Sequence, residues 1–242
     1  MRRRPTAQQQ STLLSSPVVT ARSWADWIAS ADDFTGRQEL NVHGYAVKGA
    51  RVAGLASQVD RFLSDLSLEK CGGLTRSETK EEAMLFAIWL GINDFATSQT
   101  PESMQLLLET VSEQQTRLYN EAGARNFLFV DIPPVHRTPA AARASEEQRQ
   151  TLATTLKLWH TLLSTRVSSH PGISALLFSS YAFFTGLLDD PTTYGFRDED
   201  VVNAGPTKSR IWLDELHPTS GVHRALSLSI LSFLQTAAHA TE

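Results

Sequence analysis

The sequence predicts an α/β protein built on a parallel sheet with helices on both faces. Short apolar segments of strand length alternate with longer segments in which apolar residues recur at helical spacing. Glycine, asparagine or proline follows the apolar segments, and these residues are typical of strand ends. Strands joined by helices form parallel sheets through right-handed crossovers. The 242 residues suffice for one large domain, which we expect over residues 23–242, after an irregular polar tail over residues 1–22.

The first half of the chain opens with a capped helix. Ser23 is a suitable N-cap, and Asp26 stands at the third helical position, as in a capping box. The apolar run over 83–90 is continuous, which is typical of a strand buried on both faces of a parallel sheet. The predicted elements are a helix from Ser23 to before Asp32, a strand over 40–47, a helix over 52–66, a strand over 83–90, and a helix over 101–122 that Gly123 ends.

The second half continues the alternation. Two prolines, Pro133 and Pro134, close the strand that follows Gly123, because proline cannot donate to a sheet ladder. Ligands of such sheets bind outside the carboxyl ends of the strands. The predicted elements are a strand over 126–130, a helix from Ser145 to about 169, a strand over 173–178, a loop over 189–206 and a helix over 222–238.

Composition excludes several classes of function. A formal net charge of -4 leaves no basic surface for nucleic acid, and Arg2, Arg3 and Arg4 are best interpreted as a solvated tail. No apolar run approaches the roughly 20 residues that cross a bilayer. The single cysteine, Cys71, rules out an internal disulfide and has no activating base nearby in sequence, so the compartment stays open. Neither a signal peptide nor a preferred oligomeric state is visible.

Three motifs carry chemistry, and the most compact is Asp214-Glu215-Leu216-His217-Pro218. One carboxylate can hold the imidazole N–H of His217 while the other ring nitrogen faces outward, as in two thirds of a hydrolytic triad. A glycine N–H at Gly49 and a side-chain amide at Asn93 suit the stabilisation of an oxyanion. Taken singly, Gly49 is equally typical of a turn, and Asn93-Asp94 of a loop or helix cap.

The order of these motifs resembles a known family. The segments 45–50, Gly91-Ile92-Asn93-Asp94 and 214–218 look like sequence blocks of the SGNH, or GDSL-type, lipases and esterases. Residues 126–139 and 190–196 are further similar to the fungal acylhydrolases and carbohydrate acetylesterases of that group. The resemblance covers roughly residues 24–236 and implies a flavodoxin-like sheet. It also implies a Ser-His-Asp triad with no metal or other cofactor, with His217 as general base, Asp214 as its orienting carboxylate, and Gly49 and Asn93 as oxyanion donors.

The chain departs from this family at the nucleophile. No Gly-Asp-Ser occurs in the sequence, and no Gly-x-Ser-x-Gly elbow replaces it. The nearest upstream serines, Ser11, Ser15 and Ser16, stand near Pro17, which does not suit a central strand. In the flavodoxin-like order the first strand lies between its neighbours. Without it, we expect the strands around Val42 and Phe86 either to pair directly or to expose unpaired edges.

We therefore expect an ester hydrolase lineage acting on small-molecule, carbohydrate or lipid-like esters. The sequence is interpreted first as truncated before the nucleophile, and so weakly active or inactive. The alternative is a pseudoenzyme that keeps the pocket and binds esters or glycans without turnover. Two further candidates are weaker: His217 and His223 are poorly spaced for zinc, and Trp212 either packs in the core or lines a pocket.

Overall fold

The computed structural model describes residues 22–30, 41–70, 84–167, 172–205 and 210–239. Within them lies a parallel sheet whose strands follow the order β1, β2, β3. Phe127 of the central strand pairs with Phe86 on one side and Ala175 on the other. The strands are β1 (Leu85–Ile88), β2 (Asn126–Val130) and β3 (Ser174–Phe178).

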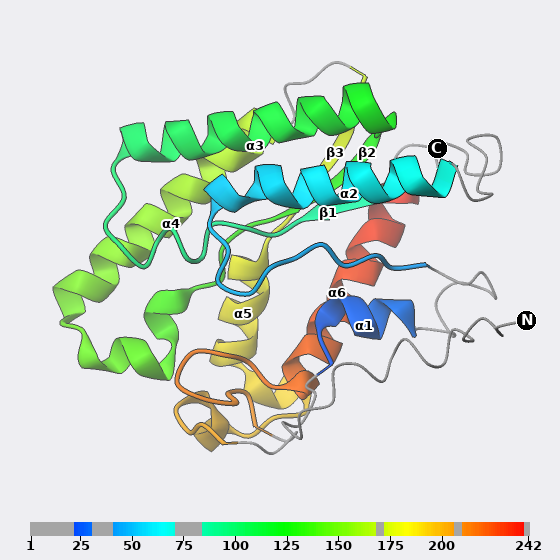
Figure 1. Ribbon diagram of the computed structural model, residues 1–242. Helices are drawn as coiled ribbons and strands as arrows, with labels where there is room; N and C mark the ends of the chain where they lie inside the picture. The colour runs from blue at the N-terminus through cyan, green and yellow to red at the C-terminus, as the bar shows by residue number, and fades with distance from the viewer. Residues whose placement is uncertain (1–21, 31–40, 71–83, 168–171, 206–209, 240–242) are drawn as a thin grey trace, which may run out of the picture.

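Helices cover both faces of this sheet (Figure 1). Alternate side chains of β2 enter two separate cores, because successive residues of a strand point to opposite faces. Phe127 and Phe129 pack with residues of three helices, and Leu128 and Val130 pack with residues of the others. The predicted α/β class is therefore confirmed. The helices on the side of Phe127 and Phe129 are α2 (Leu55–Lys70), α3 (Pro101–Ala122) and α4 (Glu146–Val167). Those on the side of Leu128 and Val130 are α1 (Trp24–Ala29), α5 (Ser180–Asp189) and α6 (Ser220–His239).

The predicted helix boundaries are largely confirmed by their caps. The Ser23 side chain accepts a hydrogen bond from the Asp26 N–H, and the Asp26 carboxylate accepts one from the Ser23 N–H. Helix α3 begins at Pro101 and ends at Gly123, whose φ of 71° is the left-handed conformation that glycine adopts without strain. The 3₁₀ turn η3 (Val52–Gly54) precedes α2. The end of the helix expected to reach about 169 lies outside the described residues.

The strand predicted over 40–47 is wrong for its described part. Residues 41–47 belong to no ladder among the described residues, and Val42 and Val47 are 45% and 50% exposed. A β-strand is stabilised by hydrogen bonds to a neighbouring strand. Local composition does not specify such a neighbour, so it suggested a strand that is not formed.

Strand β1 is shorter and more exposed than predicted. It comprises Leu85–Ile88, and its burial alternates along the strand, with Leu85 45% exposed. Among the described residues β1 pairs only with β2, so its other edge has no ladder partner there. We expected a missing first strand either to let its neighbours pair directly or to leave an edge unpaired. In the described part of the chain, the second outcome holds for β1.

Helix α5 was not predicted, although its buried residues Ser180, Phe183, Phe184, Leu187 and Leu188 recur at helical spacing. It has only ten residues, which is shorter than the window of about 11–18 residues in which this period is recognised. The loop predicted over 189–206 contains two short 3₁₀ helices, η7 (Pro191–Tyr194) and η8 (Asp198–Val201). No helix in the described part of the chain is long and apolar enough to cross a bilayer.

Candidate active site

The loop after β1 depends on a glycine. Gly91 has a φ of 110°, and a Cβ at this position would lie 3.1 Å from the Ile132 Cδ1. Its carbonyl accepts hydrogen bonds from the N–H groups of Asp94 and Phe95, which turns the chain tightly. Any larger residue would strain the backbone and press on the core, so Gly91 fixes the direction in which the next residues leave the sheet.

The structure brings the Gly49 and Asn93 loops together. The Asn93 Nδ2 donates to the Ala50 carbonyl over 2.9 Å, and the Asp94 carboxylate accepts from the Val52 N–H over 3.0 Å. Gly49 lies in a turn with a φ of 74°. The Asn93 amide carries two N–H bonds, and this contact uses one of them. A second N–H is therefore left for a ligand, and the role of both residues as oxyanion donors stays a prediction.

Asp94 serves as the anchor of this arrangement. Its side chain is 6% exposed, and burial raises the pKa of the carboxyl above its usual value. The Val52 N–H and the charge of Arg51 oppose that shift. A buried carboxylate with a backbone donor ties η3, which precedes α2, to the loop after β1, and this keeps Asn93 next to the Gly49 turn.

Asp214 and His217 form the pair that the sequence predicts. The His217 Nδ1 lies 2.8 Å from the Asp214 Oδ2 and 3.0 Å from Oδ1. Asp214 Oδ1 also accepts the N–H groups of Leu216 and His217, at 2.8 and 2.7 Å. Since an ionised carboxylate only accepts hydrogen bonds, Nδ1 carries the proton and Nε2 is left as the basic nitrogen.

The protonation of Asp214 follows from these contacts. Burial acts to raise the pKa of Asp214, but hydrogen bonds from the His217 and Leu216 N–H groups and from the His217 ring outweigh it. The pKa of Asp214 therefore lies below its usual value. The side chains of Asp214 and His217 are 54% and 59% exposed, so solvent and small molecules reach the pair.

The turn that carries the pair is held from several sides. The Ala140 N–H donates to the Glu215 carbonyl over 2.9 Å, and Arg143 forms an ion pair with the Glu215 carboxylate. Both partners belong to η6 (Pro139–Arg143), which follows η5 (Val135–Arg137). The Trp212 Nε1 donates to the Val201 carbonyl over 2.8 Å, and its ring is 3% exposed. Trp212 therefore packs in the core and does not line a pocket.

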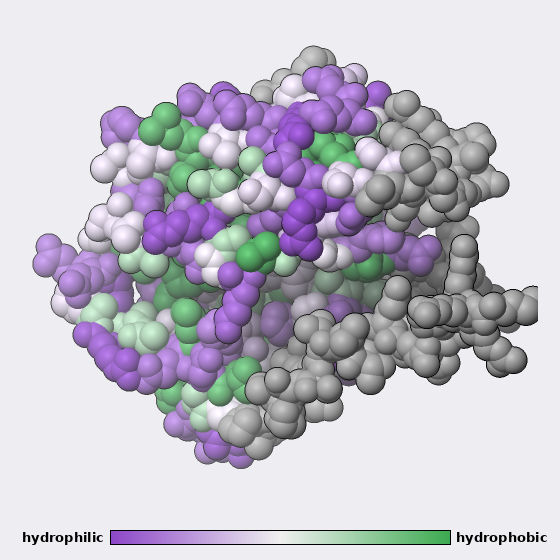
Figure 2. Space-filling view, viewed as in Figure 1, coloured by the Kyte–Doolittle hydropathy of each residue, from purple (hydrophilic) through white to green (hydrophobic). Residues whose placement is uncertain are grey.

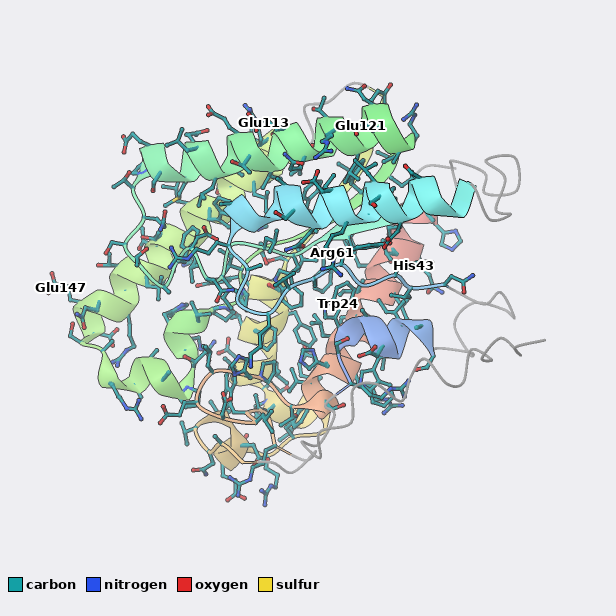
Figure 3. The ribbon with its side chains drawn as sticks, viewed as in Figure 1. Trp24, His43, Arg61, Glu113, Glu121 and Glu147 are labelled. Carbon is teal, nitrogen blue, oxygen red and sulfur yellow. The ribbon has the colours of Figure 1, made fainter. Side chains whose placement is uncertain are left out.

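Helix α1 links the two parts of the candidate site. Figure 3 shows Trp24 on α1, and its ring centroid lies 6.1 Å from that of Trp89, directly after β1. The Trp27 Nε1 donates to the Ser220 Oγ, at the first residue of α6 and just after His217. One short helix thus contacts both the end of β1 and the helix that follows the Asp214–His217 turn.

His223 stands three residues after Ser220 on α6. Burial lowers the pKa of His223 below its usual value; the charge of Asp26 opposes the shift, and His217 adds to it. The His223 Nδ1 is buried and has no hydrogen-bond partner among the described residues. Its imidazole is therefore best accommodated in the neutral form.

No serine of the described residues hydrogen-bonds to the His217 ring, whose contacts there are with Asp214. Ser11, Ser15 and Ser16 lie outside the described residues, as does Cys71. The predicted orienting carboxylate and base are thus in contact, and the predicted oxyanion donors are adjacent to each other. A nucleophile does not accompany them within the ranges that the structure covers.

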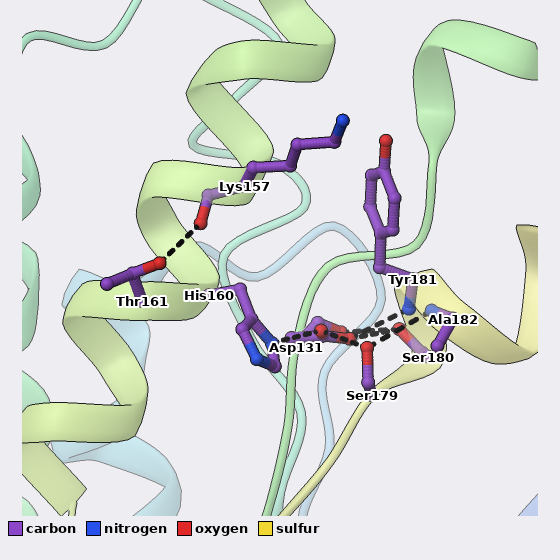
Figure 4. Close-up of polar contacts among 8 residues, drawn as sticks. All are labelled: Asp131, Lys157, His160, Thr161, Ser179, Ser180, Tyr181 and Ala182. Atoms are coloured by element: carbon purple, nitrogen blue, oxygen red, sulfur yellow. Dashed lines mark hydrogen bonds and ion pairs between the residues drawn. The ribbon is translucent and has the colours of Figure 1, made fainter.

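A second Asp–His pair was missed by the sequence analysis (Figure 4). Asp131 follows β2 and is 1% exposed, and its Oδ2 lies 2.7 Å from the His160 Nδ1. The same carboxylate accepts the hydroxyls of Ser179 and Ser180 and the N–H of Tyr181. The available signal was positional: Asp131 and Ser179 both directly follow parallel strands, whose carboxyl ends share one edge.

Comparison with known proteins decides the family. The family model described as GDSL-like Lipase/Acylhydrolase matches residues 17–230, which is most of the chain. The chain belongs to this family. Its parallel sheet with helices on both faces agrees with the SGNH hydrolase fold that the resemblance implied.

A curated relative of this GDSL-like chain is an acetylesterase of Thermothelomyces thermophilus, 29% identical over 154 residues. The match covers 60% of this chain and 51% of the relative. The match therefore spans about half the length of the relative. The activity of the whole relative is not assigned to this chain on that basis.

Proposed function

We propose that the site hydrolyses small carboxylic esters, with His217 as general base and Asp214 as its orienting carboxylate. The observation that carries the proposal is the Asp214–His217 contact of 2.8 Å on an exposed turn. The Asn93 amide, fixed beside the Gly49 turn, supports it because an ester hydrolase needs donors for an oxyanion. The family and the acetylesterase relative favour acetyl or other acyl esters of carbohydrate or lipid-like alcohols.

Proton movements in this scheme begin at the His217 Nε2. In a Ser-His-Asp mechanism Nε2 takes the proton of a serine hydroxyl, which then attacks the carbonyl carbon. The sequence contains no Gly-Asp-Ser, and the remaining nucleophile is a water molecule. Nε2 accepts a proton from this water as its oxygen bonds to the carbonyl carbon. The oxyanion receives hydrogen bonds from Gly49 and Asn93, and its collapse releases the alcohol, which takes the proton back from His217.

We infer that the chain as given turns esters over slowly. Loss of a triad nucleophile lowers turnover by a factor on the order of 10⁶, and only the oxyanion donors and substrate binding remain of the triad mechanism. Residual hydrolysis should depend on His217 only through the attack of water, because general-base activation of that water contributes about 10²–10⁴-fold.

The test is hydrolysis of p-nitrophenyl acetate by the wild-type chain and by His217→Ala, together with labelling by a fluorophosphonate that reacts with activated serines. We expect slow turnover, a loss of at least about 10² in His217→Ala and no phosphonate adduct. Rapid turnover with a labelled serine would show that a nucleophile is present after all. Equal residual rates in both proteins would overturn the role of His217.

A second candidate function is ester or glycan binding without turnover, which the absence of Gly-Asp-Ser favours. Titration of acetylated monosaccharides into the wild-type chain, followed by the NMR signal of the His217 ring, separates the two. Binding that is lost in Asn93→Ala, with hydrolysis at the buffer rate, supports this alternative. Hydrolysis that depends on His217 supports the enzyme.

A further inference from the structure

A cluster of side-chain donors lies around the buried Asp131 carboxylate, outside the carboxyl ends of β2 and β3. Tyr181 stands in the first turn of α5, and its N–H donates to the Asp131 Oδ1 over 2.9 Å. The Tyr181 ring stacks on the ring of His136 in η5, with the two centroids 5.9 Å apart. The His160 ring of α4 contacts the Asp131 Oδ2. Elements η5, α4 and α5 therefore meet at this carboxylate.

Lys157 joins the cluster from α4. It stands three residues before His160, so the two side chains leave the same face of the helix. Figure 4 shows the Lys157 ammonium and the Tyr181 hydroxyl on the same side, both above the His160 ring in that view. Burial lowers the pKa of His136, and the charges of Arg137 and Lys157 lower it further. Lys157 is thus within electrostatic reach of the imidazole that stacks on Tyr181.

These groups are donors that lack acceptors among the described residues. The Lys157 ammonium and the Tyr181 hydroxyl form no hydrogen bond there. The His136 Nδ1 is buried without a partner in the same part of the chain. A buried N–H without an acceptor is costly, so the neutral ring carries its proton on Nε2, which becomes a third donor. Asp131 cannot serve them, because both of its oxygens already accept from His160, Ser179, Ser180 and the Tyr181 N–H.

The charged groups that act on His136 favour an anion. Arg137 and Lys157 are cations, and the carboxylate that opposes them is that of Glu146. Glu146 is paired with Arg149 over 2.5 Å, so its charge is largely offset. Arg137 pairs with the last residue of α5 over 2.7 Å. The Lys157 ammonium is therefore the cation that the cluster leaves for a ligand.

Cations on other surfaces of the molecule differ from Lys157. Figure 2 shows mostly hydrophilic residues along α3, where Arg117 forms ion pairs with both Asp60 and Glu121. Two adjacent carboxylates offset the charge of this arginine for an added anion. Lys157 has no carboxylate within ion-pair distance in the described part of the chain, and two further donors stand beside it.

We propose that Lys157, Tyr181 and His136 bind a phosphate group, which accepts hydrogen bonds from the ammonium, the phenolic O–H and the imidazole Nε2–H. Donors from three elements suit an anion whose oxygens point in several directions, and a doubly charged anion gains more from Lys157 than a carboxylate does. The buried Asp131–His160 pair then acts as a support, because it holds α4 and the start of α5 together. The proposal goes beyond ester hydrolysis and does not depend on it.

Direct binding measurements test the proposal without any turnover. Inorganic phosphate, glycerol 3-phosphate and acetate are titrated into the full chain at pH 7.5 and constant ionic strength, and the ring signals of His136 and Tyr181 are followed by NMR. We expect phosphate to bind at least about tenfold more tightly than acetate. The tighter of the two phosphates identifies the ligand as the free ion or as an organic phosphate.

Two variants locate the binding. Lys157→Gln should weaken phosphate binding about tenfold or more, because it removes a charge-assisted hydrogen bond. Tyr181→Phe should weaken it about fivefold, since the ring and its stacking on His136 remain while the O–H is lost. In both variants the His136 ring signals report binding, and circular dichroism separates loss of binding from loss of folding.

Arg61→Gln is the matched control, because it removes one exposed positive charge from α2. It should bind phosphate within about twofold of the wild-type affinity, since distant exposed charges are screened. Phosphate that binds no more tightly than acetate, or that leaves the His136 signals unmoved, would overturn the proposal. Equal losses of affinity in Arg61→Gln and Lys157→Gln would do the same, because they would show attraction to net charge and no defined site.

Discussion

The molecule contains two carboxylate–imidazole pairs with almost the same contact and opposite surroundings. The Nδ1 to Oδ2 distance is 2.8 Å in Asp214–His217 and 2.7 Å in Asp131–His160. The Asp214 side chain is 54% exposed, whereas that of Asp131 is 1% exposed. Geometry alone therefore does not separate a pair available for chemistry from a pair that holds the fold together.

Burial makes the difference between the pairs. An exposed pair contributes little to stability, because water competes for both partners. A buried carboxylate that organises donors from several elements is costly to remove, since each donor loses its partner. Asp131 joins β2 to His160 of α4 and to the first residues of α5. We infer that Asp131–His160 serves the fold and Asp214–His217 the chemistry.

Removal of each carboxylate gives the largest predicted contrast. Asp131→Ala should lower the free energy of unfolding by about 1–3 kcal/mol, because the His160 ring, the Ser179 hydroxyl and the Tyr181 N–H lose their acceptor. Asp214→Ala should lower it by less than about 1 kcal/mol. Urea unfolding followed by tryptophan fluorescence measures both. Similar losses in the two variants would mean that burial does not distinguish the pairs.

The same two variants should differ in activity in the opposite sense. Asp214→Ala should reduce the residual hydrolysis of p-nitrophenyl acetate by about 10²-fold or more, because His217 loses the partner that fixes its tautomer and orientation. The rate is measured per folded molecule, at a temperature where each variant is folded. An unchanged rate in Asp214→Ala would remove Asp214 from the mechanism.

A smaller effect concerns pH and the half-buried His223. Its pKa is lowered in the folded state, so the unfolded chain binds the proton more readily. Stability should therefore fall as the pH drops through the usual histidine pKa of about 6.5 toward the folded value. Asp26 and His217 are the charged groups that act on His223.

His223→Gln, which cannot gain this proton, should lose less stability than the wild-type chain between pH 7.5 and pH 5.5. Urea midpoints at the two pH values give the comparison, and the difference between the proteins is the informative quantity. If His223→Gln loses as much stability as wild type over this interval, the pH sensitivity arises from other groups.

The smallest predicted effect is that of the Arg143–Glu215 ion pair beside the exposed pair. Both side chains are largely exposed, so Arg143→Gln should change the free energy of unfolding by at most about 0.2–1 kcal/mol. The Ala140 N–H still holds the Glu215 carbonyl in this variant, which should keep His217 in place. A larger loss at high salt than at low salt would contradict this interpretation, since salt screens exposed pairs.

The sequence predicted the contact between Asp214 and His217 because this contact is local. Asp214 and His217 are three residues apart, and a turn of that length can be inferred from residue types alone. Asp131 and His160 are 29 residues apart, so their contact depends on how α4 packs on the sheet. Spacing in the sequence gives no signal for such a pair.

In the fold as well, features that depend on local interactions were predicted and features that depend on long-range packing were not. Helix ends at Ser23, Pro101 and Gly123 were predicted because capping is a local interaction. The strand over 40–47 was not a strand, since a ladder requires a neighbour that local sequence does not specify. Helix α5 was missed because its ten residues are fewer than the roughly 11–18 over which helical spacing is recognised in a sequence.

The most direct measurement is the residual hydrolysis of p-nitrophenyl acetate by wild type, His217→Ala and His160→Gln, each normalised to folded protein. The roles inferred for the two pairs predict a loss of at least about 10²-fold in His217→Ala and a rate within about twofold of wild type in His160→Gln. A retained rate in His217→Ala, or a loss confined to His160→Gln, would contradict the assignment of Asp214–His217 as the chemical pair.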